Sequence, residues 1–123
     1  MSLLIIDYGI GNIGSVRRAF EECCKNSVFV SDDPRDLKRA ARFVLPGVGS
    51  FRDGMDRLRQ RGWPEAISEA LDAGTPMLGI CLGMQLLAEQ GTEGGETRGL
   101  SIIPGQTLRL IPDRPEVRTP HVG

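Results

Sequence analysis

The chain has 123 residues, a length that fits one domain, so we expect residues 1–123 to form a single domain. Hydrophobic residues make up 40% and charged residues 25%, which is enough to bury a core in a water-soluble protein. The 15 basic and 16 acidic residues nearly cancel, and no apolar run is long enough to span a bilayer. These features argue against nucleic-acid and membrane partners.

The cysteines and the start of the chain indicate a compartment. Three cysteines, two of them adjacent, do not make a disulfide framework, which fits a reducing environment. The first residues reach Asp7 too soon, and without a charged leading region, for a signal peptide. We therefore expect a cytoplasmic protein.

Strand and helix patterns alternate in the first three quarters of the chain. Apolar runs predict strands at residues 3–6, 27–31, 42–46 and 76–80. Apolar positions at helical spacing predict helices at about 12–24, 33–41, 51–58, 63–71 and 82–88. This alternation predicts an α/β fold: a parallel sheet with helices on both faces. Ligands gather at the carboxyl ends of such strands, which draws attention to the loops at 7–14, 46–51 and 79–83.

After about residue 90 the pattern changes. Residues 91–96 are rich in glycine and predict a turn or flexible loop, while residues 100–105 and 107–111 predict two short strands. Residues 112–123 contain three prolines and no periodic pattern. The chain stops there without a capped helix or a paired strand.

A strand-to-helix turn presents Cys81 between Gly79 and Gly83. Glycines flank a nucleophile in this way because side chains at those places would clash in so tight a bend. Backbone N–H groups at the start of the next helix would surround the thiol and favour the thiolate. We therefore predict that Cys81 is a nucleophile; the alternative is a buried cysteine that closes a core strand. Cys23 and Cys24 lie in a helical pattern without metal-ligand spacing and are interpreted as packing residues, so no metal site is predicted.

The loop after the third predicted strand could assist that chemistry. Attack of a thiolate on a carbonyl creates an oxyanion, which needs preorganised N–H donors. The amide of Leu82, directly after the predicted nucleophile, is the natural first donor. An amide from Gly47, Val48 or Gly49 could be the second, and the alternative is an ordinary strand-to-helix turn.

The loop after the first predicted strand carries a competing signal. Residues from Gly9 to Gly14 read GxGxxG between a strand and a helix, and Asp32 and Asp33 follow about twenty residues later, as in a dinucleotide-binding fold. Asp7 would repel a pyrophosphate unless it were paired. The alternatives are a tight glycine turn in which Asn12 caps the helix, and a binding or interface role for the loop.

Three motifs together resemble a known family. They are Asp-Tyr-Gly-x-Gly-Asn at 7–12, Pro-Gly-Val-Gly-Ser-Phe at 46–51 and Gly-x-Cys-x-Gly-x-Gln at 79–85. The chain resembles the class I glutamine amidotransferases over essentially its whole length. Within that class it is similar to the glutaminase subunits of imidazole glycerol phosphate synthases, which act in histidine biosynthesis.

The resemblance implies a flavodoxin-like fold and a cofactor-free hydrolysis of L-glutamine to glutamate and ammonia through a cysteine thioester. Ammonia would pass to a (β/α)8-barrel cyclase, the partner in a cytoplasmic heterodimer, which makes imidazole glycerol phosphate and AICAR. Cys81 would be the nucleophile, Val48 and Leu82 the oxyanion donors, and Gln85 and Gly49 substrate-binding residues. The Pro-Gly-Val-Gly segment would rearrange when the partner binds its ligand. Relatives that feed other cyclase-like partners carry the same motifs, so the pathway stays open.

One departure from the family pattern concerns the catalytic base. The family uses a His and a Glu well downstream of the nucleophile, whereas the only histidine here, His121, matches a Pro-His-x-Gly segment. We therefore interpret His121, like Asn12, as an interface candidate and not as the base. The chain is expected to be the N-terminal portion of a longer subunit, with the C-terminal part missing and at most trace activity alone. The alternatives are a catalytically silent scaffold partner of a synthase and the nucleotide-binding module.

Overall fold

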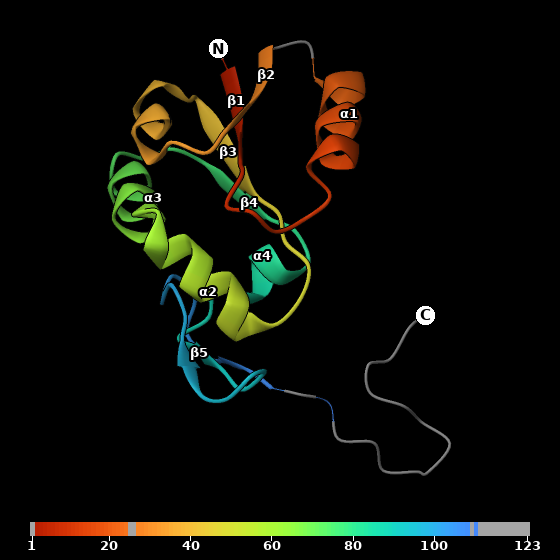
Figure 1. Ribbon diagram of the computed structural model, residues 1–123. Coiled ribbons are helices and arrows are strands. Elements are labelled where there is room, and N and C mark those ends of the chain that lie inside the picture. The colour runs from red at the N-terminus through yellow and green to blue at the C-terminus, as the bar shows by residue number, and fades with distance from the viewer. Residues whose placement is uncertain (1, 25–26, 109, 111–123) are drawn as a thin grey trace.

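The structure of the protein is a computed structural model that describes residues 2–24, 27–108 and 110 (Figure 1). Four parallel strands form its main sheet: β1 (Ser2–Ile6), β2 (Ser27–Ser31), β3 (Arg42–Leu45) and β4 (Met77–Gly79), in the order β2-β1-β3-β4. In the central strand, Leu4 lies opposite Phe29 on one side and Phe43 on the other. The predicted α/β fold and the four strands that build its sheet are confirmed.

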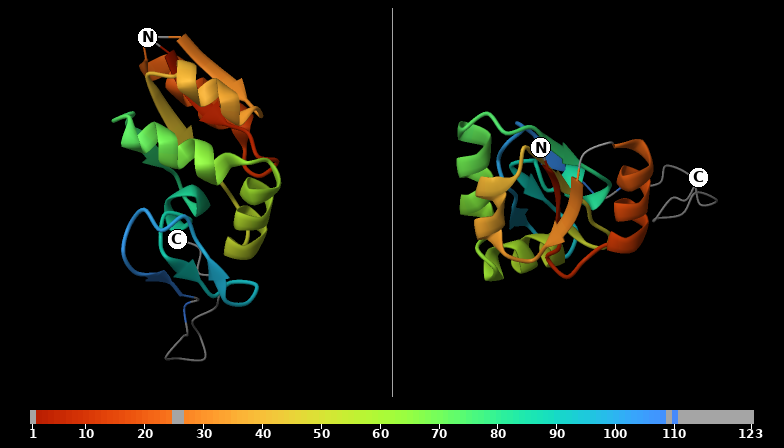
Figure 2. Two further views of the ribbon diagram at one scale, coloured as in Figure 1. Left: turned by 90° about the vertical axis from the view of Figure 1, so that its left-hand side faces the viewer. Right: turned by 90° about the horizontal axis from the view of Figure 1, so that it is seen from above.

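Helices cover the two faces of this sheet (Figure 2). Helix α1 (Ile13–Cys23) lies on one face, where its half-buried Ile13, Val16 and Phe20 pack against a cluster that contains Leu3 and Ile5. The other face is covered by the 3₁₀ helix η1 (Pro34–Arg39), α2 (Phe51–Gln60) and α3 (Trp63–Asp72). Side chains alternate between the faces along β1, so this short strand contributes to both clusters.

The helix predicted over 33–41 is a 3₁₀ helix and not an α-helix. Asp33 caps it and Pro34 occupies its first turn, as expected, but residues 34–39 form a 3₁₀ helix. Its amides bond three residues back, from Asp36 to Asp33 and from Ala40 to Leu37. The connection from β2 to β3, which crosses β1 in the sheet, is short, and short connections commonly use the tighter 3₁₀ helix.

The interpretation of Cys23 as a packing residue is wrong, because this side chain is exposed. Helix α1 ends at Cys23, and the extended backbone of Cys24 places the Cys24 side chain against the sheet instead.

Helix α4 (Leu82–Gln85) is shorter than the predicted helix over 82–88. The backbone carbonyls of Leu86, Leu87 and Ala88 accept hydrogen bonds from the amides of residues 100–103, at 2.9 to 3.1 Å. These carbonyls therefore have partners without a further helical turn. The same bonds explain why residues 100–105 contain no strand, contrary to the prediction.

The last described elements are β5 (Gln90–Gly91), β6 (Thr97–Arg98) and β7 (Gln106–Thr107), which form a small sheet in the order β6-β5-β7. The predicted turn at 91–96 connects β5 to β6. Of the strand predicted over 107–111, Thr107 lies in the two-residue β7 and residues 108 and 110 lie in no strand, while residues 109 and 111 lie outside the described part.

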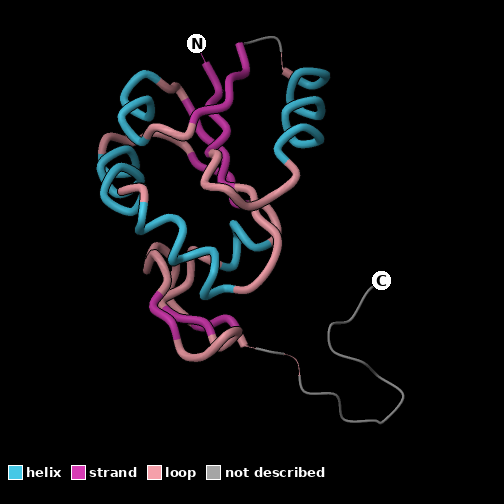
Figure 3. The backbone as a smooth tube through the Cα atoms, viewed as in Figure 1, coloured by secondary structure: helices cyan, strands magenta, loops and turns pink. Residues whose placement is uncertain are grey.

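The carboxyl ends of β1, β3 and β4 lead into loops that meet at one end of the main sheet (Figure 3). A Cβ atom built on Gly11 would lie 3.6 Å from the Cα of Gly47, and one on Gly47 would lie 3.1 Å from the Cβ of Leu82. The three loops singled out in the sequence are therefore packed together.

Candidate functional site

The thiol of Cys81 is exposed at the end of β4, as a nucleophile requires and as a core cysteine would not be. The amide of Gly83 donates to the Ile80 carbonyl at 2.9 Å, which closes a turn with Cys81 at its second position. Cys81 has φ 53° and ψ −120°, close to the first central residue of a type II′ turn. Glycine normally occupies that position, so the cysteine stores backbone strain at the tip of the turn.

The two glycines that flank Cys81 are required by close backbone contacts. A Cβ on Gly83 would overlap the carbonyl oxygen of Leu45, the last residue of β3. A Cβ on Gly79 would lie 2.8 Å from the Cα of Met84 and 2.9 Å from its nitrogen. The glycines therefore let α4 approach the strand ends, and this geometry is the one predicted for a nucleophile turn.

The amides around Cys81 are already engaged in hydrogen bonds. Leu82 N–H donates to the Gly47 carbonyl at 3.3 Å, while Met84 and Gln85 donate to the Cys81 carbonyl at 3.0 and 3.2 Å. The sequence predicted that N–H groups at the start of the helix surround the thiol, with the Leu82 amide as an oxyanion donor. They are not free in this conformation because the turn and the neighbouring loop supply carbonyl acceptors for them.

The loop at 46–50 therefore faces the nucleophile turn with a carbonyl group and not with an amide. Val48 is 57% exposed, and Gly49 has φ +107°, a conformation that favours glycine. Within residues 2–24, 27–108 and 110, no hydrogen-bond acceptor is found for the amide of either residue. The loop thus has two amides without an acceptor in the described part of the chain, those of Val48 and Gly49, next to the Gly47 carbonyl that accepts from Leu82.

Tyr8 supports this loop from the protein interior. Its side chain is fully buried, and its hydroxyl donates to the Pro46 carbonyl at 2.6 Å. Burial raises the pKa of the phenol well above its usual range, so the group stays a neutral donor. Sequence reasoning used Tyr8 only as part of a motif. The available signal was the chain's one tyrosine, two residues after a buried strand, at the sheet end where the other loops meet.

The GxGxxG loop is closed by its own residues. The amide of Gly9 donates to the Asp7 carboxylate at 3.1 Å, and the Asn12 side chain accepts from Ser15 N at 3.3 Å, which caps α1 as predicted. Asp33, one of the two acids considered for a ribose, caps η1 and pairs with Arg35 at 2.8 Å. The hydrogen bonds from Arg35 lower the pKa of the Asp33 carboxyl. These contacts support the tight-turn interpretation.

Gln85, predicted to bind the substrate, lies beside a cavity that does not include Cys81. Gln85 lines a cavity of about 290 Å³ between α4 and residues 103–107, together with Met84 and Ile103, and Cys81 is not among the residues that line it. The structure therefore does not bring the Gln85 side chain and the thiol into one cavity. His121 lies outside the described residues.

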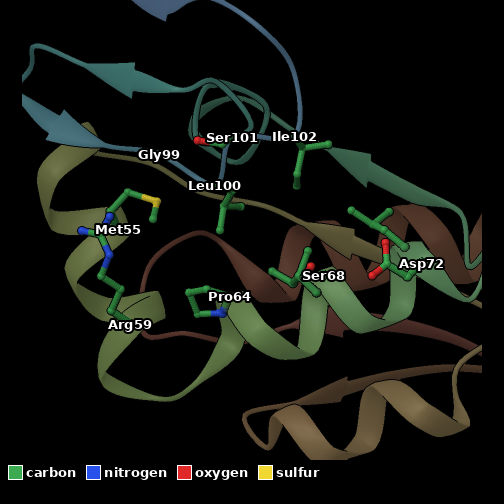
Figure 4. A pocket seen from close by; sticks show the side chains of 11 residues that line it. Met55, Arg59, Pro64, Ser68, Asp72, Gly99, Leu100, Ser101 and Ile102 are labelled. Carbon is green, nitrogen blue, oxygen red and sulfur yellow. The ribbon is translucent and has the colours of Figure 1, made fainter.

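A cavity of about 320 Å³ lies between α2, α3 and residues 99–102 (Figure 4). Arg59 and Asp72 lie at opposite ends of it, with Leu100 between them. None of the residues that line it belongs to the three loops near Cys81. This cavity is therefore separate from the candidate site.

Comparison with known proteins identifies the family of the chain. The model of the glutamine amidotransferase class-I family matches residues 4–118. The chain belongs to this family. Its Cys81 turn and the loop at 46–50 thus lie in a glutamine amidotransferase fold.

The curated relatives that the chain resembles include subunits of one enzyme within this family. The chain is 46% identical over 122 residues to the imidazole glycerol phosphate synthase subunit HisH of Geobacillus sp. (strain WCH70), covering 97% of this chain and 57% of the relative. It is 49% identical over 121 residues to the HisH subunit of Symbiobacterium thermophilum, covering 98% and 55%. The chain therefore spans a little over half the length of these relatives.

Solved structures support the fold. A glutamine amidotransferase crystal structure superposes with a TM-score of 0.72 at 16% identity, covering 86% of this chain and 56% of that one. A putative peptidase E protein from Listeria monocytogenes EGD-e superposes with a TM-score of 0.61 at 14% identity, covering 72% and 50%. At these identities the likeness concerns the fold alone.

Proposed function

We propose that Cys81 is the nucleophile of a glutaminase that hydrolyses L-glutamine to glutamate and ammonia. The observation that carries this proposal is the exposed thiol on a strained type II′ turn, in a chain that belongs to the class-I glutamine amidotransferases. The thiolate attacks the side-chain amide carbon, the C–S bond forms, and the C–N bond breaks with protonation of the leaving ammonia. Water then cleaves the thioester to glutamate and returns the thiol.

Stabilising the oxyanion of this reaction requires a change in the loop at 46–50. The amide of Leu82 donates to the Gly47 carbonyl in the structure, so that donor must be released before it can bind an oxyanion. Rotation of the peptide between Gly47 and Val48 would withdraw the carbonyl and turn the Val48 amide inward. In this proposal Leu82 and Val48 are the two donors, and Gly49 and Gln85 contact the glutamine.

The ammonia acceptor is proposed from the relatives. These relatives are named as subunits of imidazole glycerol phosphate synthase, so a partner subunit is expected for this chain as well. We propose a (β/α)8-barrel cyclase in a cytoplasmic heterodimer, with Asn12 and His121 near the contact and ammonia channelled between the subunits. Among the helices that the structure describes, none has the length and apolar character of a membrane span.

A silent scaffold role is the second candidate, favoured by the engaged Leu82 amide. A thiol without a neighbouring base is a weak nucleophile at neutral pH. The expectation that the 123-residue chain has at most trace glutaminase turnover stays a prediction. Robust turnover of the purified chain would contradict it.

The proposal is tested by labelling with a chloroketone analogue of glutamine, followed by intact-mass and peptide mapping. We expect one adduct, located at Cys81, slowed by excess L-glutamine and lost in Cys81→Ser. The matched control is Cys23→Ser, which removes another exposed thiol and should leave the adduct unchanged. Equal labelling of Cys23, or no protection by glutamine, would refute a glutamine site. Formation of a tight complex with a barrel cyclase without labelling would support the scaffold role.

A further inference from the structure

We propose that Tyr8 is a positioning residue, whose buried hydroxyl fixes the Pro46 carbonyl and thereby holds the Gly47 carbonyl on the amide of Leu82. Tyr8 would thus set how readily that amide becomes available. The inference rests on the proposed function, since it concerns the donor that would bind the oxyanion.

The first step is the contact between the Tyr8 hydroxyl and the core-facing side of the loop. The Tyr8 side chain is 0% exposed, and its hydroxyl lies 2.6 Å from the Pro46 oxygen, at the short end of the range for O–H···O bonds. A Cβ built on Gly47 would overlap the Tyr8 hydroxyl, so the Cα of Gly47 rests directly on this oxygen. The phenol therefore holds two successive residues of the loop, one by a hydrogen bond and one by contact.

The second step is the contact between Gly47 and the start of α4, on the opposite side of the loop from Tyr8. A Cβ on Gly47 would lie 3.1 Å from the Cβ of Leu82 and 3.2 Å from the nitrogen of Gly83, so the first turn of α4 presses on Gly47 from the other side. The Ile80 amide bonds to the Leu45 carbonyl at 2.9 Å, which ties the nucleophile turn to the end of β3. Gly47 is thus enclosed between the Tyr8 hydroxyl and α4.

The third step is the consequence for Leu82. Because Gly47 is enclosed, its carbonyl can leave the Leu82 amide only if the peptide rotates in place or if Gly47 moves down toward the core. The Tyr8 hydroxyl blocks the downward movement, and its bond to Pro46 fixes the peptide unit next to the one that must rotate. A core-filling role alone would be served equally by phenylalanine, which lacks both constraints.

The test is Tyr8→Phe in the 123-residue chain, with two measurements. Loss of one hydrogen bond should raise the hydrogen-exchange rate of the Leu82 amide about three- to tenfold, measured by NMR. The ratio of Cys81 labelling rates with the glutamine chloroketone and with iodoacetamide should rise by a similar factor. Only the first reagent passes through an oxyanion, so a general loss of stability would change both reagents alike.

The matched control is Ser31→Ala. Ser31 is a buried residue whose hydroxyl donates to Asp36 at 2.6 Å, at the end of β2, which β1 separates from β3 and the Pro46 loop. Because Ser31→Ala removes only that hydroxyl and keeps the backbone bond from the Asp7 amide to the Ser31 carbonyl, it should leave the Leu82 exchange rate and the labelling ratio unchanged. Unchanged or slower exchange in Tyr8→Phe, or an equal effect in Ser31→Ala, would overturn the role of Tyr8.

A second variant covers the case in which Tyr8→Phe does not fold. The chain contains one tyrosine, so biosynthetic incorporation of 3-fluorotyrosine changes Tyr8 alone. The more acidic phenol is a stronger donor to Pro46, and the Leu82 amide should then exchange more slowly; unchanged or faster exchange would overturn the inference. If no variant reacts with the chloroketone, the proposed glutaminase fails, while the exchange rates still decide the role of Tyr8.

Discussion

Cys81 occupies a backbone conformation that glycine adopts with less strain. Its φ of 53° and ψ of −120° place a Cβ atom where a type II′ turn normally has none. Such strain costs of the order of 1–3 kcal/mol and is typical of functional sites, where the surrounding structure enforces it. The cysteine is therefore retained at the expense of stability, as expected for a reactive side chain.

This strain leads to a prediction for Cys81→Gly. Relief of the strain should outweigh the extra flexibility of glycine in the unfolded chain and raise the free energy of unfolding by about 1 kcal/mol. Urea denaturation followed by circular dichroism measures this change. The same variant should lose all labelling by the glutamine chloroketone.

Cys23→Gly is the matched control for that prediction. Cys23 is also exposed, but it is the last residue of α1, where glycine relieves no strain and should destabilise slightly, by up to about 0.5 kcal/mol. A loss of stability in Cys81→Gly similar to that of Cys23→Gly would show that the turn at Cys81 is not strained.

At the level of elements, the carbonyl groups of residues 86–88 connect the nucleophile turn to the small sheet. They accept hydrogen bonds from residues 100–103, while Gly99 lies directly against this connection. A Cβ atom on Gly99 would overlap the Ala88 carbonyl and lie 2.9 Å from the Phe51 ring. The end of α4 is thus fixed by a segment that follows it by more than ten residues.

Gly99→Ala should therefore destabilise the protein by about 1–3 kcal/mol, because neither the Ala88 backbone nor the buried Phe51 ring can move away freely. Thermal and urea denaturation measure the effect. Gly14→Ala is the control: Gly14 lies in α1 with no atom within 4 Å of its added Cβ, so this change should stabilise by about 0.5–1 kcal/mol. Equal effects of the two substitutions would contradict the close contact at Gly99.

These same contacts explain how much of the structure the sequence could predict. The strands of the main sheet and the cap of α1 at Asn12 follow from local patterns, and so does the turn at Cys81. The early end of α4 and the irregular path of residues 100–105 depend on hydrogen bonds between distant segments, which periodicity does not reveal. Tyr8 escaped notice for the same reason, because its partner Pro46 is 38 residues away.

On the scale of the whole molecule, the main sheet is open along β4. Within the described residues this strand pairs with β3 only, and Leu78 is 51% exposed beside the nucleophile turn. Met84, which follows the turn, is 56% exposed. An apolar parallel strand with an open edge is a template for association with other chains.

Leu78→Lys should therefore weaken any self-association of the 123-residue chain through β4, by about ten- to a hundredfold in dissociation constant, since a buried leucine contributes roughly 1.5–3 kcal/mol to an interface. Sedimentation velocity over a range of concentrations measures this. Leu108→Lys serves as control, because Leu108 is 63% exposed but lies beyond β7. An equal effect of both substitutions would indicate nonspecific apolar association and not pairing at β4.

The burial of Tyr8 has a further, spectroscopic consequence. Tyr8 and Trp63 are the only residues of their types in the chain, and both are fully buried in the same core cluster. The Trp63 indole N–H has no hydrogen-bond partner among the described residues, which favours short-wavelength fluorescence in the folded state. Excitation absorbed by the phenol can pass to the indole across this core. The emission spectrum of the unlabelled protein should therefore report, from one tyrosine and one tryptophan, whether the layer beneath the Pro46 loop is intact.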